Sequence, residues 1–201
     1  MAHPRYTRDR MAALVARDIP EGSYVNLGIG MPTLVGNHLG AGREVVLHSE
    51  NGLLGMGPPP APQDEDPDFH HADSFAMIRG GHLDICVLGA FQVSVAGDLA
   101  NWHTGAPDAI PAVGGAMDLA AGANRVLVMM EHLTKAGESK IVERLSCPVT
   151  ALACVDRIYT DLAVIDVTPH GLAVREIVDG VSLGELRRLT GVPLSDGRAS
   201  A

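Results

Sequence analysis

A glutamate that directly follows a predicted strand is the first residue of this sequence that could do covalent chemistry. Residues 44–48, "EVVLH", form a short strand-like run, and "SENG" follows with Glu50 in it. In an open parallel sheet, ligands gather at the carboxyl ends of the strands, so a carboxylate placed there can meet a substrate. A cap or an ion-paired loop carboxylate is an equally common use of such a residue. The spacing alone leaves both interpretations of Glu50 open.

Two glycine pairs could present backbone N–H groups to an anion. Gly28 and Gly30, in "NLGIGMPT", join a predicted strand to a predicted short helix, where unpaired N–H groups can face an anion. This pair lacks the third glycine and the acidic residue of a dinucleotide-binding fingerprint, so a tight turn is the better supported interpretation. Gly114 and Gly115 precede the predicted helix in "GAMDLAAGA", where an unhindered amide could hold an oxyanion or only let a helix pack closely on a strand.

The turn "GDLANWHTG" gathers several polar side chains between two predicted buried strands. It contains Asp98, Asn101, Trp102 and His103. A tryptophan in such a place is more often part of the core than a platform for a cofactor. A serine nucleophile would need a G-x-S-x-G elbow, which the sequence lacks, so a serine hydrolase has little support.

Alternating helical and strand patterns place these residues on an α/β fold. Met11, Leu14 and Val15 recur with helical spacing in "TRDRMAALVARD", and the apolar run "SYVNLGIG" at 23–30 predicts a strand soon after. The alternation continues with a helix in "MPTLVGNHL", a strand at 44–48, a helix in "ADSFAMIRGG", a buried strand region in "LDICVLGAFQVS", a helix in "GAMDLAAGA" and a strand in "RVLVMME". Such alternation favours an open, mostly parallel sheet covered by helices.

The last third of the chain predicts a β-hairpin followed by a helix. Two β-rich runs flank the turn residues 168–171 in "DLAVIDVTPHGLAVREIV", and Ser182 begins the helix in "SLGELRRLTG". The length suits one sizeable domain, which we place at 1–190, with a flexible tail at 191–201. The segment 57–68, "GPPPAPQDEDPD", predicts a surface loop because it is rich in proline and acidic residues.

The composition argues against several classes of function. The net charge is −9 and the sequence pI is about 5.4, so nucleic acid is not an expected partner. The apolar runs are much shorter than the roughly 20 residues of a membrane span, and the start lacks a secretory signal, which predicts a cytoplasmic protein. Cys86, Cys147 and Cys154 have no C-x-x-C spacing, and no further ligands accompany His70 and His71, so we expect no metal site.

Taken together, these motifs resemble the class I CoA-transferases, and specifically the B (β) subunit of the 3-oxoacid CoA-transferases. The resemblance is carried by "HSENGLLGMGP", and the other matching segments are "VNLGIGMPTLV", "DSFAMIRGGH", "GDLANW", "GGAMDLA", "MEHLTKAGESKIVERLSCPVT" and "RIYTDLAVIDV". Together they cover nearly the whole chain and imply the sheet of that family, which sugar-phosphate isomerases share. The segments "GAFQVS", "NWHTGAPDAIPAVGGAMDLA" and "VTPHGL" look most like the 3-oxoadipate enzymes of aromatic degradation.

The resemblance also implies roles for individual residues. Glu50 matches the glutamate that acts as nucleophile and carries a glutamyl-CoA thioester, and the amide of Gly115 matches the oxyanion-hole position. His103 and Thr104 are candidates for binding a dicarboxylic acid, because donor groups suit a carboxylate. The substrate- and CoA-binding candidates are Asn51, Gly52, Gly28, Gly30, Gly114, His103 and Thr104.

A partner chain is a further implication of the resemblance. The reaction would move CoA from succinyl-CoA to a 3-oxoacid, with CoA thioesters as substrates and without a cofactor or metal. The sequence lacks the glycine-rich CoA-binding half expected of the A (α) subunit, so we expect activity only with a separate A-type chain, in an assembly of two A and two B chains. The alternatives are an acetoacetate, acetate or butyrate enzyme with the same mechanism, and a non-catalytic ligand-sensing domain on the same fold.

One segment departs from the family pattern. Family members carry a further stretch containing Asn-Ala-Gly-Lys between the acidic loop and "FHHADSF", whereas here Asp68 is followed directly by Phe69. Either this stretch is truly lost, or the intact gene product retains it. The hypothesis is that it is retained as a mobile lid-type loop beside the active site. A measured mass of the intact chain equal to 21.1 kDa would contradict it.

Overall fold

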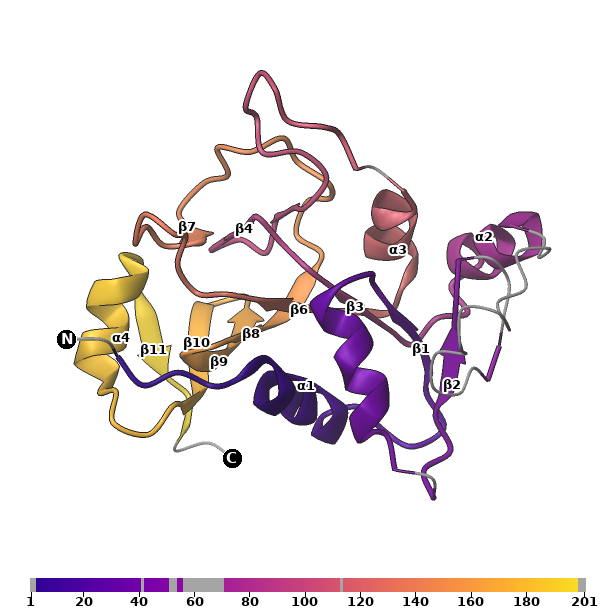
Figure 1. Cartoon of the computed structure of the whole chain (residues 1–201), viewed down its shortest axis with the longest axis horizontal. Coiled ribbons are helices and arrows are strands. Elements are labelled where there is room, and N and C mark those ends of the chain that lie inside the picture. The colour runs from indigo at the N-terminus through magenta and orange to yellow at the C-terminus, as the bar shows by residue number, and fades with distance from the viewer. Residues whose placement is uncertain (1–2, 41, 51–53, 56–70, 113, 199–201) are drawn as a thin grey trace.

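The computed structural model describes residues 3–40, 42–50, 54–55, 71–112 and 114–198. Within these residues the strands form two sheets (Figure 1). The larger sheet has eight strands in the order β11-β10-β9-β8-β6-β3-β1-β2, and the smaller has three in the order β5-β4-β7. The mostly parallel large sheet with its flanking helices confirms the α/β class that the alternation predicts.

The strands and helices of the described residues are short. The strands of the large sheet are β1 (Tyr24–Leu27), β2 (Val46–His48), β3 (Ile85–Leu88), β6 (Arg125–Met130), β8 (Val155–Thr160), β9 (Ala163–Thr168), β10 (Gly171–Ile177) and β11 (Leu194–Asp196). The strands of the small sheet are β4 (Gln92–Ser94), β5 (Leu99–Ala100) and β7 (Ile141–Val142). The helices are α1 (Arg8–Arg17), the 3₁₀-helix η1 (Met31–His38), α2 (His71–Arg79), α3 (Ala116–Gly122) and α4 (Leu183–Thr190).

The parallel half of the large sheet carries the candidate site. Strands β2, β1, β3, β6 and β8 pair in parallel, so their carboxyl ends lie at one edge of the sheet. In this register Asn26 of β1 lies opposite both His48 of β2 and Cys86 of β3. Successive side chains point to opposite faces, so Cys86 enters one core and Val87 the other.

Helices cover both faces of the large sheet (Figure 1). On one face α1 and η1 pack in a core that contains Met11, Leu14 and Val15, as their helical spacing predicts. On the other face α2 and α3 contribute Ile78 and Leu119 to a core that also receives apolar residues of the small sheet and α4. The second core holds α2 and α3, and these helices bring Ser74 and Gly115 into contact with Ser49 and Glu50 after β2.

The predicted hairpin is present, and two other segments differ from prediction. β9 and β10 pair antiparallel around the turn at 168–171, and Ser182 caps α4 by accepting from the Glu185 N–H at 3.1 Å. The segment 194–196 forms β11 and pairs with β10, in place of the flexible tail predicted for 191–201, because Leu194 is buried. The run "LDICVLGAFQVS" is divided between two sheets as β3 and β4, and the predicted loop at 57–68 lies outside the described residues.

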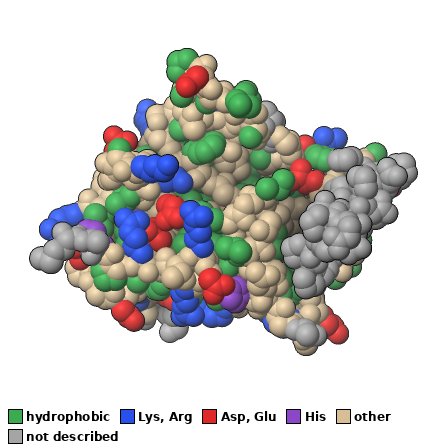
Figure 2. All heavy atoms as spheres, in the orientation of Figure 1, with side chains coloured by type: hydrophobic (Ala, Val, Ile, Leu, Met, Phe, Trp, Pro, Cys, Tyr) green, Lys and Arg blue, Asp and Glu red, His purple; other side chains and the backbone are tan. Residues whose placement is uncertain are grey.

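Ion pairs join the end of α1 to the antiparallel strands. Arg157 of β8 contacts the carboxylates of Asp18 and Asp166, and Arg175 of β10 contacts Asp166 as well. Burial alone would raise the pKa of Asp166, but the two guanidinium groups outweigh it and hold that pKa below its ordinary value. In Figure 2, basic and acidic side chains lie side by side over this part of the molecule.

A buried histidine ties α4 to the large sheet. His132 follows β6 and is fully buried, with Nδ1 2.9 Å from Oγ1 of Thr160 and Nε2 2.9 Å from Oγ1 of Thr190. Burial lowers the pKa of His132 to about 4, because the interior disfavours the charged imidazolium. The fold therefore contains a histidine that must stay neutral.

Acid should destabilise the fold through His132. In the unfolded chain its pKa is the ordinary 6.5, so as the pH falls from 6.5 to about 4 the unfolded chain binds a proton that the folded chain does not. The free energy of unfolding should fall by roughly 3 kcal/mol across this window. Urea unfolding at several pH values checks this: H132Q should lose that part of the slope, and H170Q, at an exposed turn, should keep it. Equal slopes for H132Q and the wild type would contradict the assignment.

Candidate active site

Glu50 lies just beyond the carboxyl end of β2, and its side chain reaches a residue far away in the sequence. The N–H of Gly115 donates to Oε2 of Glu50 at 3.0 Å, which joins positions 65 apart. The Glu50 side chain is partly exposed, so a reacting group can approach it. The described structure thus places a partly exposed carboxylate beside a fixed backbone donor. Asn51 and Gly52, the candidates for orienting Glu50, lie outside the described residues.

This close approach requires glycine at position 115. A Cβ atom there would lie 2.8 Å from the carboxyl carbon of Glu50 and 3.2 Å from Cζ of Phe75, with Oε2 nearer still. The preceding Gly114 has a φ of 45°, a left-handed conformation that favours glycine. Of the two interpretations of this pair, the geometry supports an amide that faces a carboxylate.

Helices α2 and α3 hold Gly115 against Glu50. Helix α3 begins directly after Gly115, and α2 supplies Phe75. The two helices meet at Gly122, where a Cβ atom would lie 2.9 Å from the carbonyl carbon of Ile78. Arg79 and Asp118 join the same helices by an ion pair at 2.7 Å. The position of the Gly115 amide therefore depends on the packing of α2 on α3.

Three buried polar side chains lie behind the strand end that carries Glu50. Asn26, His48 and Ser74 are each exposed by 2% or less. Nδ2 of Asn26 lies 3.1 Å from Nδ1 of His48, and Oγ of Ser74 lies 3.0 Å from Nε2 of His48. Burial lowers the pKa of His48 below its ordinary value. No sequence motif assigns a role to these three residues, although Asn26 is notable as a polar side chain inside the apolar run "YVNLG".

The glycines of "NLGIG" serve the backbone geometry of β1. The N–H of Gly28 donates to the carbonyl oxygen of Val87 at 2.8 Å, so it is not free to bind an anion. A Cβ atom on Gly28 would lie 3.1 Å from the same oxygen, which explains the glycine by close backbone approach. Gly30 has a φ of 101° and begins η1, as in a tight turn. No described hydrogen bond joins either glycine to Glu50.

His103 and Thr104 hold their own loop together. The N–H of Gly105 donates to Nδ1 of His103 at 2.9 Å, and Nε2 of His103 lies 3.2 Å from the carbonyl oxygen of Ala109. Oγ1 of Thr104 accepts from the N–H of Ala106. Because the loop uses both ring nitrogens, His103 has no nitrogen left for a substrate carboxylate in this conformation. Its place is in shaping the segment that leads into α3.

Neither a cluster of metal ligands nor a reactive buried thiol occurs among the described residues. The described residues contain no group of three His, Cys, Asp or Glu side chains that could hold a metal ion. Burial raises the pKa of Cys86 far above its ordinary value and that of Cys154 to about 11, so neither thiol forms a thiolate near neutral pH. Across the same residues, none of the helices has the length and apolar character needed to span a bilayer.

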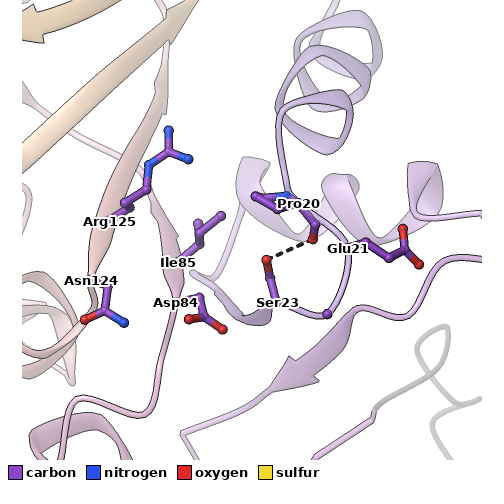
Figure 3. A pocket seen from close by; sticks show the side chains of 8 residues that line it. Pro20, Glu21, Ser23, Asp84, Ile85, Asn124 and Arg125 are labelled. Atoms are coloured by element: carbon purple, nitrogen blue, oxygen red, sulfur yellow. Dashed lines mark hydrogen bonds between the residues drawn. The ribbon is translucent and has the colours of Figure 1, made fainter.

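A hollow of about 350 Å³ lies at the opposite edge of the sheet from Glu50 (Figure 3). Its lining comes from the amino ends of β1, β3 and β6 and from the turn before β1. The lining residues are Pro20, Glu21, Gly22, Ser23, Asp84, Ile85, Asn124 and Arg125. Ligands of parallel sheets collect at the carboxyl ends of the strands, so we place the candidate active site at Glu50.

The chain is similar to coenzyme A transferases in sequence. The model of the family described as coenzyme A transferase matches residues 8–186. The B subunit of the 3-oxoadipate CoA-transferase of Acinetobacter baylyi is 61% identical over 213 residues, covering 98% of this chain and 98% of that protein. A protein with the same name from Pseudomonas putida is 63% identical over 207 residues, covering 94% of this chain and 97% of that protein.

A solved structure has the same fold. The apoenzyme of the acyl-CoA transferase YdiF from Escherichia coli O157:H7 matches with a TM-score of 0.78 at 20% identity, over 98% of this chain and 43% of that chain. At this identity the likeness concerns the fold alone, and it confirms the predicted CoA-transferase type of sheet.

The alignments also bear on the departure at Asp68 and Phe69. The alignment with the Acinetobacter protein runs over 213 positions and this chain has 201 residues, so at least 12 positions of that relative have no counterpart here. This agrees with a family stretch that the present sequence lacks, and its place at 68–69 stays a prediction because these residues lie outside the described ones.

Adding one methyl group at position 115 should displace the Glu50 carboxylate. In G115A the new Cβ cannot lie 2.8 Å from the carboxyl carbon, so the side chain must turn away and lose the bond to the amide. A crystal structure checks this, and unfolding should show a cost of about 1–3 kcal/mol from overpacking. The control is G89A, because a Cβ atom on Gly89 meets open space. A G115A structure with the hydrogen bond intact would contradict this account.

Proposed function

This chain belongs to the coenzyme A transferase family, and we propose that it is the catalytic B subunit of a 3-oxoadipate CoA-transferase with succinyl-CoA as donor. Two relatives that bear this subunit name are more than 60% identical over nearly their whole length, which supports the proposal. The observation that carries the mechanism is the contact between Oε2 of Glu50 and the N–H of Gly115.

The proposed chemistry uses Glu50 as a covalent carrier of CoA. Its carboxylate attacks the acyl carbon of succinyl-CoA, and the C–S bond breaks to give an acyl-glutamyl anhydride and CoA thiolate. The thiolate then attacks the glutamyl carbonyl, which forms the glutamyl-CoA thioester and releases succinate. The carboxylate of 3-oxoadipate attacks this thioester, and the same two steps in reverse yield 3-oxoadipyl-CoA and free Glu50. Every step is an acyl transfer, so no cofactor or metal is required.

In the proposed mechanism, the backbone amide of Gly115 stabilises the oxyanion of the tetrahedral intermediates. A carboxylate is a poor nucleophile toward a thioester, so each tetrahedral intermediate needs a donor for its oxyanion. The amide already points at the Glu50 carboxyl oxygen, and it stays beside that group while the glutamyl carbonyl becomes tetrahedral. Loss of one such donor elsewhere costs about 10²–10³-fold in rate, which sets the scale expected here.

The proposed enzyme needs a second chain. The relatives' names designate a B subunit, and we propose that this chain pairs with an A-type chain, in an assembly of two copies of each, in the cytoplasm. Binding energy from the remote CoA arm, held by the partner, would then offset the poor reactivity of Glu50 at the reacting centre. Activity is therefore expected from the co-expressed pair and not from this chain alone.

Replacing Glu50 should abolish transfer in the co-expressed complex. E50Q keeps the size of the side chain and removes the nucleophilic carboxylate, so the rate of transfer from succinyl-CoA to 3-oxoadipate should fall by about 10⁴-fold or more. E44Q, at an exposed glutamate before β2, should keep wild-type activity. An E50A or E50Q complex with wild-type kcat would overturn the covalent mechanism and favour a ligand-sensing role for the fold.

Kinetics with a panel of acceptor acids should identify the preferred substrate. With succinyl-CoA as donor, kcat/KM for 3-oxoadipate should exceed the values for acetoacetate, acetate and butyrate by at least about 10-fold, the ratio that 1.4 kcal/mol of transition-state discrimination provides. A preference for a monocarboxylic acid would keep the Glu50 mechanism and reject the 3-oxoadipate assignment.

A further inference from the structure

The polar side chains behind Glu50 form one continuous chain of hydrogen bonds between two backbone carbonyls. The order is His48 O, Asn26, the His48 ring, Ser74 and Ser49 O. Both carbonyls belong to the two residues directly before Glu50. All three side chains are buried, so each unmade hydrogen bond here would cost about 1–3 kcal/mol.

The backbone carbonyl of His48 fixes the orientation of the Asn26 side-chain amide. Nδ2 of Asn26 lies 3.2 Å from the carbonyl oxygen of His48, which can only accept. If the amide were turned over, Oδ1 would face this oxygen, acceptor against acceptor. The NH₂ group must therefore occupy the position that also lies 3.1 Å from Nδ1 of His48. Nδ1 must accept from it and cannot carry a proton.

The carbonyl of Ser49, at the other end of the hydrogen-bond chain, requires the same protonation of His48. Oγ of Ser74 lies 2.7 Å from the carbonyl oxygen of Ser49, so the single hydroxyl proton of Ser74 is donated there. Ser74 can then only accept from Nε2 of His48, which lies 3.0 Å away. Nε2 must carry a proton. Both ends of the chain thus require the same neutral tautomer of His48, with its proton on Nε2.

Helix α2 links this chain to the oxyanion donor. Ser74 holds the peptide before Glu50, and the adjacent Phe75 lies where a Cβ atom on Gly115 would meet its ring. Asn26 anchors the other end of this hydrogen-bond chain to β1, which lies between β2 and β3. One rigid unit of sheet and helix therefore sets the backbone of Glu50 and the surroundings of the amide that faces its carboxylate.

We propose that His48 is a positioning residue for Glu50: its neutral Nε2–H tautomer locks Asn26 and Ser74 onto the two carbonyls before Glu50 and so aims the carboxylate at Gly115. The proposal rests on the proposed function, in which Glu50 is the nucleophile. His48 touches no substrate in this account and acts only through the backbone of Glu50. Such a residue should govern kcat more than KM, because substrate binding does not depend on it.

Paired substitutions test this role in the co-expressed complex. H48Q keeps a donor and an acceptor, whereas H48M has a similar volume and neither. We expect kcat to fall by about 10²-fold in H48M with KM for succinyl-CoA nearly unchanged, the effect of a misplaced reacting group, and to recover largely in H48Q. S74A removes one hydroxyl and should lower kcat in the same way. Wild-type kcat in both H48M and S74A would overturn the proposal, and unfolding curves show whether each variant is folded.

The tautomer is measured independently of activity. In the full chain labelled with ¹⁵N-histidine, H48Q identifies the His48 signals by their loss. At neutral pH these signals should show a pyridine-type Nδ1 and a protonated, pyrrole-type Nε2, and S74A should alter them. An Nδ1–H tautomer or an imidazolium at neutral pH would refute the proposal. The NMR measurement is independent of the role of Glu50. An active E50Q complex would reject Glu50 as the nucleophile and would leave the tautomer assignment of His48 unchanged.

Discussion

The site depends on one close contact, between the carboxylate of Glu50 and the backbone amide of Gly115. The contact exists only because position 115 has no side chain, since a Cβ atom would occupy the space of the carboxyl group. Everything around it serves to bring these two groups together from distant parts of the chain. A strand end supplies the carboxylate, and the start of a helix supplies the amide.

The contact depends on the packing of segments that are far apart in the sequence. Glu50 follows β2 at the edge of the large sheet, and Gly115 reaches it because α2 and α3 pack against the same face. Glycine recurs where the helices cross, at Gly122, for the same steric reason. Behind the carboxylate, Asn26, His48 and Ser74 replace water as partners for the backbone, so the strand end is fixed rather than frayed.

The sequence predicts the elements of this fold better than the contacts between them. Helical spacing identifies the buried face of α1, and the turn at 168–171 identifies the hairpin, because both signals are local. The role of Gly115 stays undecided between oxyanion binding and close packing at that level, since its neighbour Glu50 is 65 positions away. The resemblance to a family, and not the spacing, names Glu50 as the nucleophile.

The misses have the same origin. His103 looks like a ligand for a carboxylate in the sequence, yet its ring nitrogens are used by its own loop, which only a folded backbone reveals. Gly28 is one of the substrate-binding candidates, yet its N–H donates to the carbonyl oxygen of Val87 in β3. Leu194 lies in a tail of mostly small and polar residues, and its burial accompanies the pairing of 194–196 with β10 as an edge strand.

The central claim is that Glu50 carries CoA covalently, and mass spectrometry of the complex tests it most directly. The co-expressed pair is incubated with succinyl-CoA in the absence of an acceptor acid, quenched with acid and digested. We predict that the peptide containing Glu50 gains CoA through a thioester, with loss of one water, and that hydroxylamine releases CoA and leaves a glutamyl hydroxamate. An unmodified Glu50 peptide, or an adduct on another residue, in a preparation that shows full activity once 3-oxoadipate is added would contradict the account.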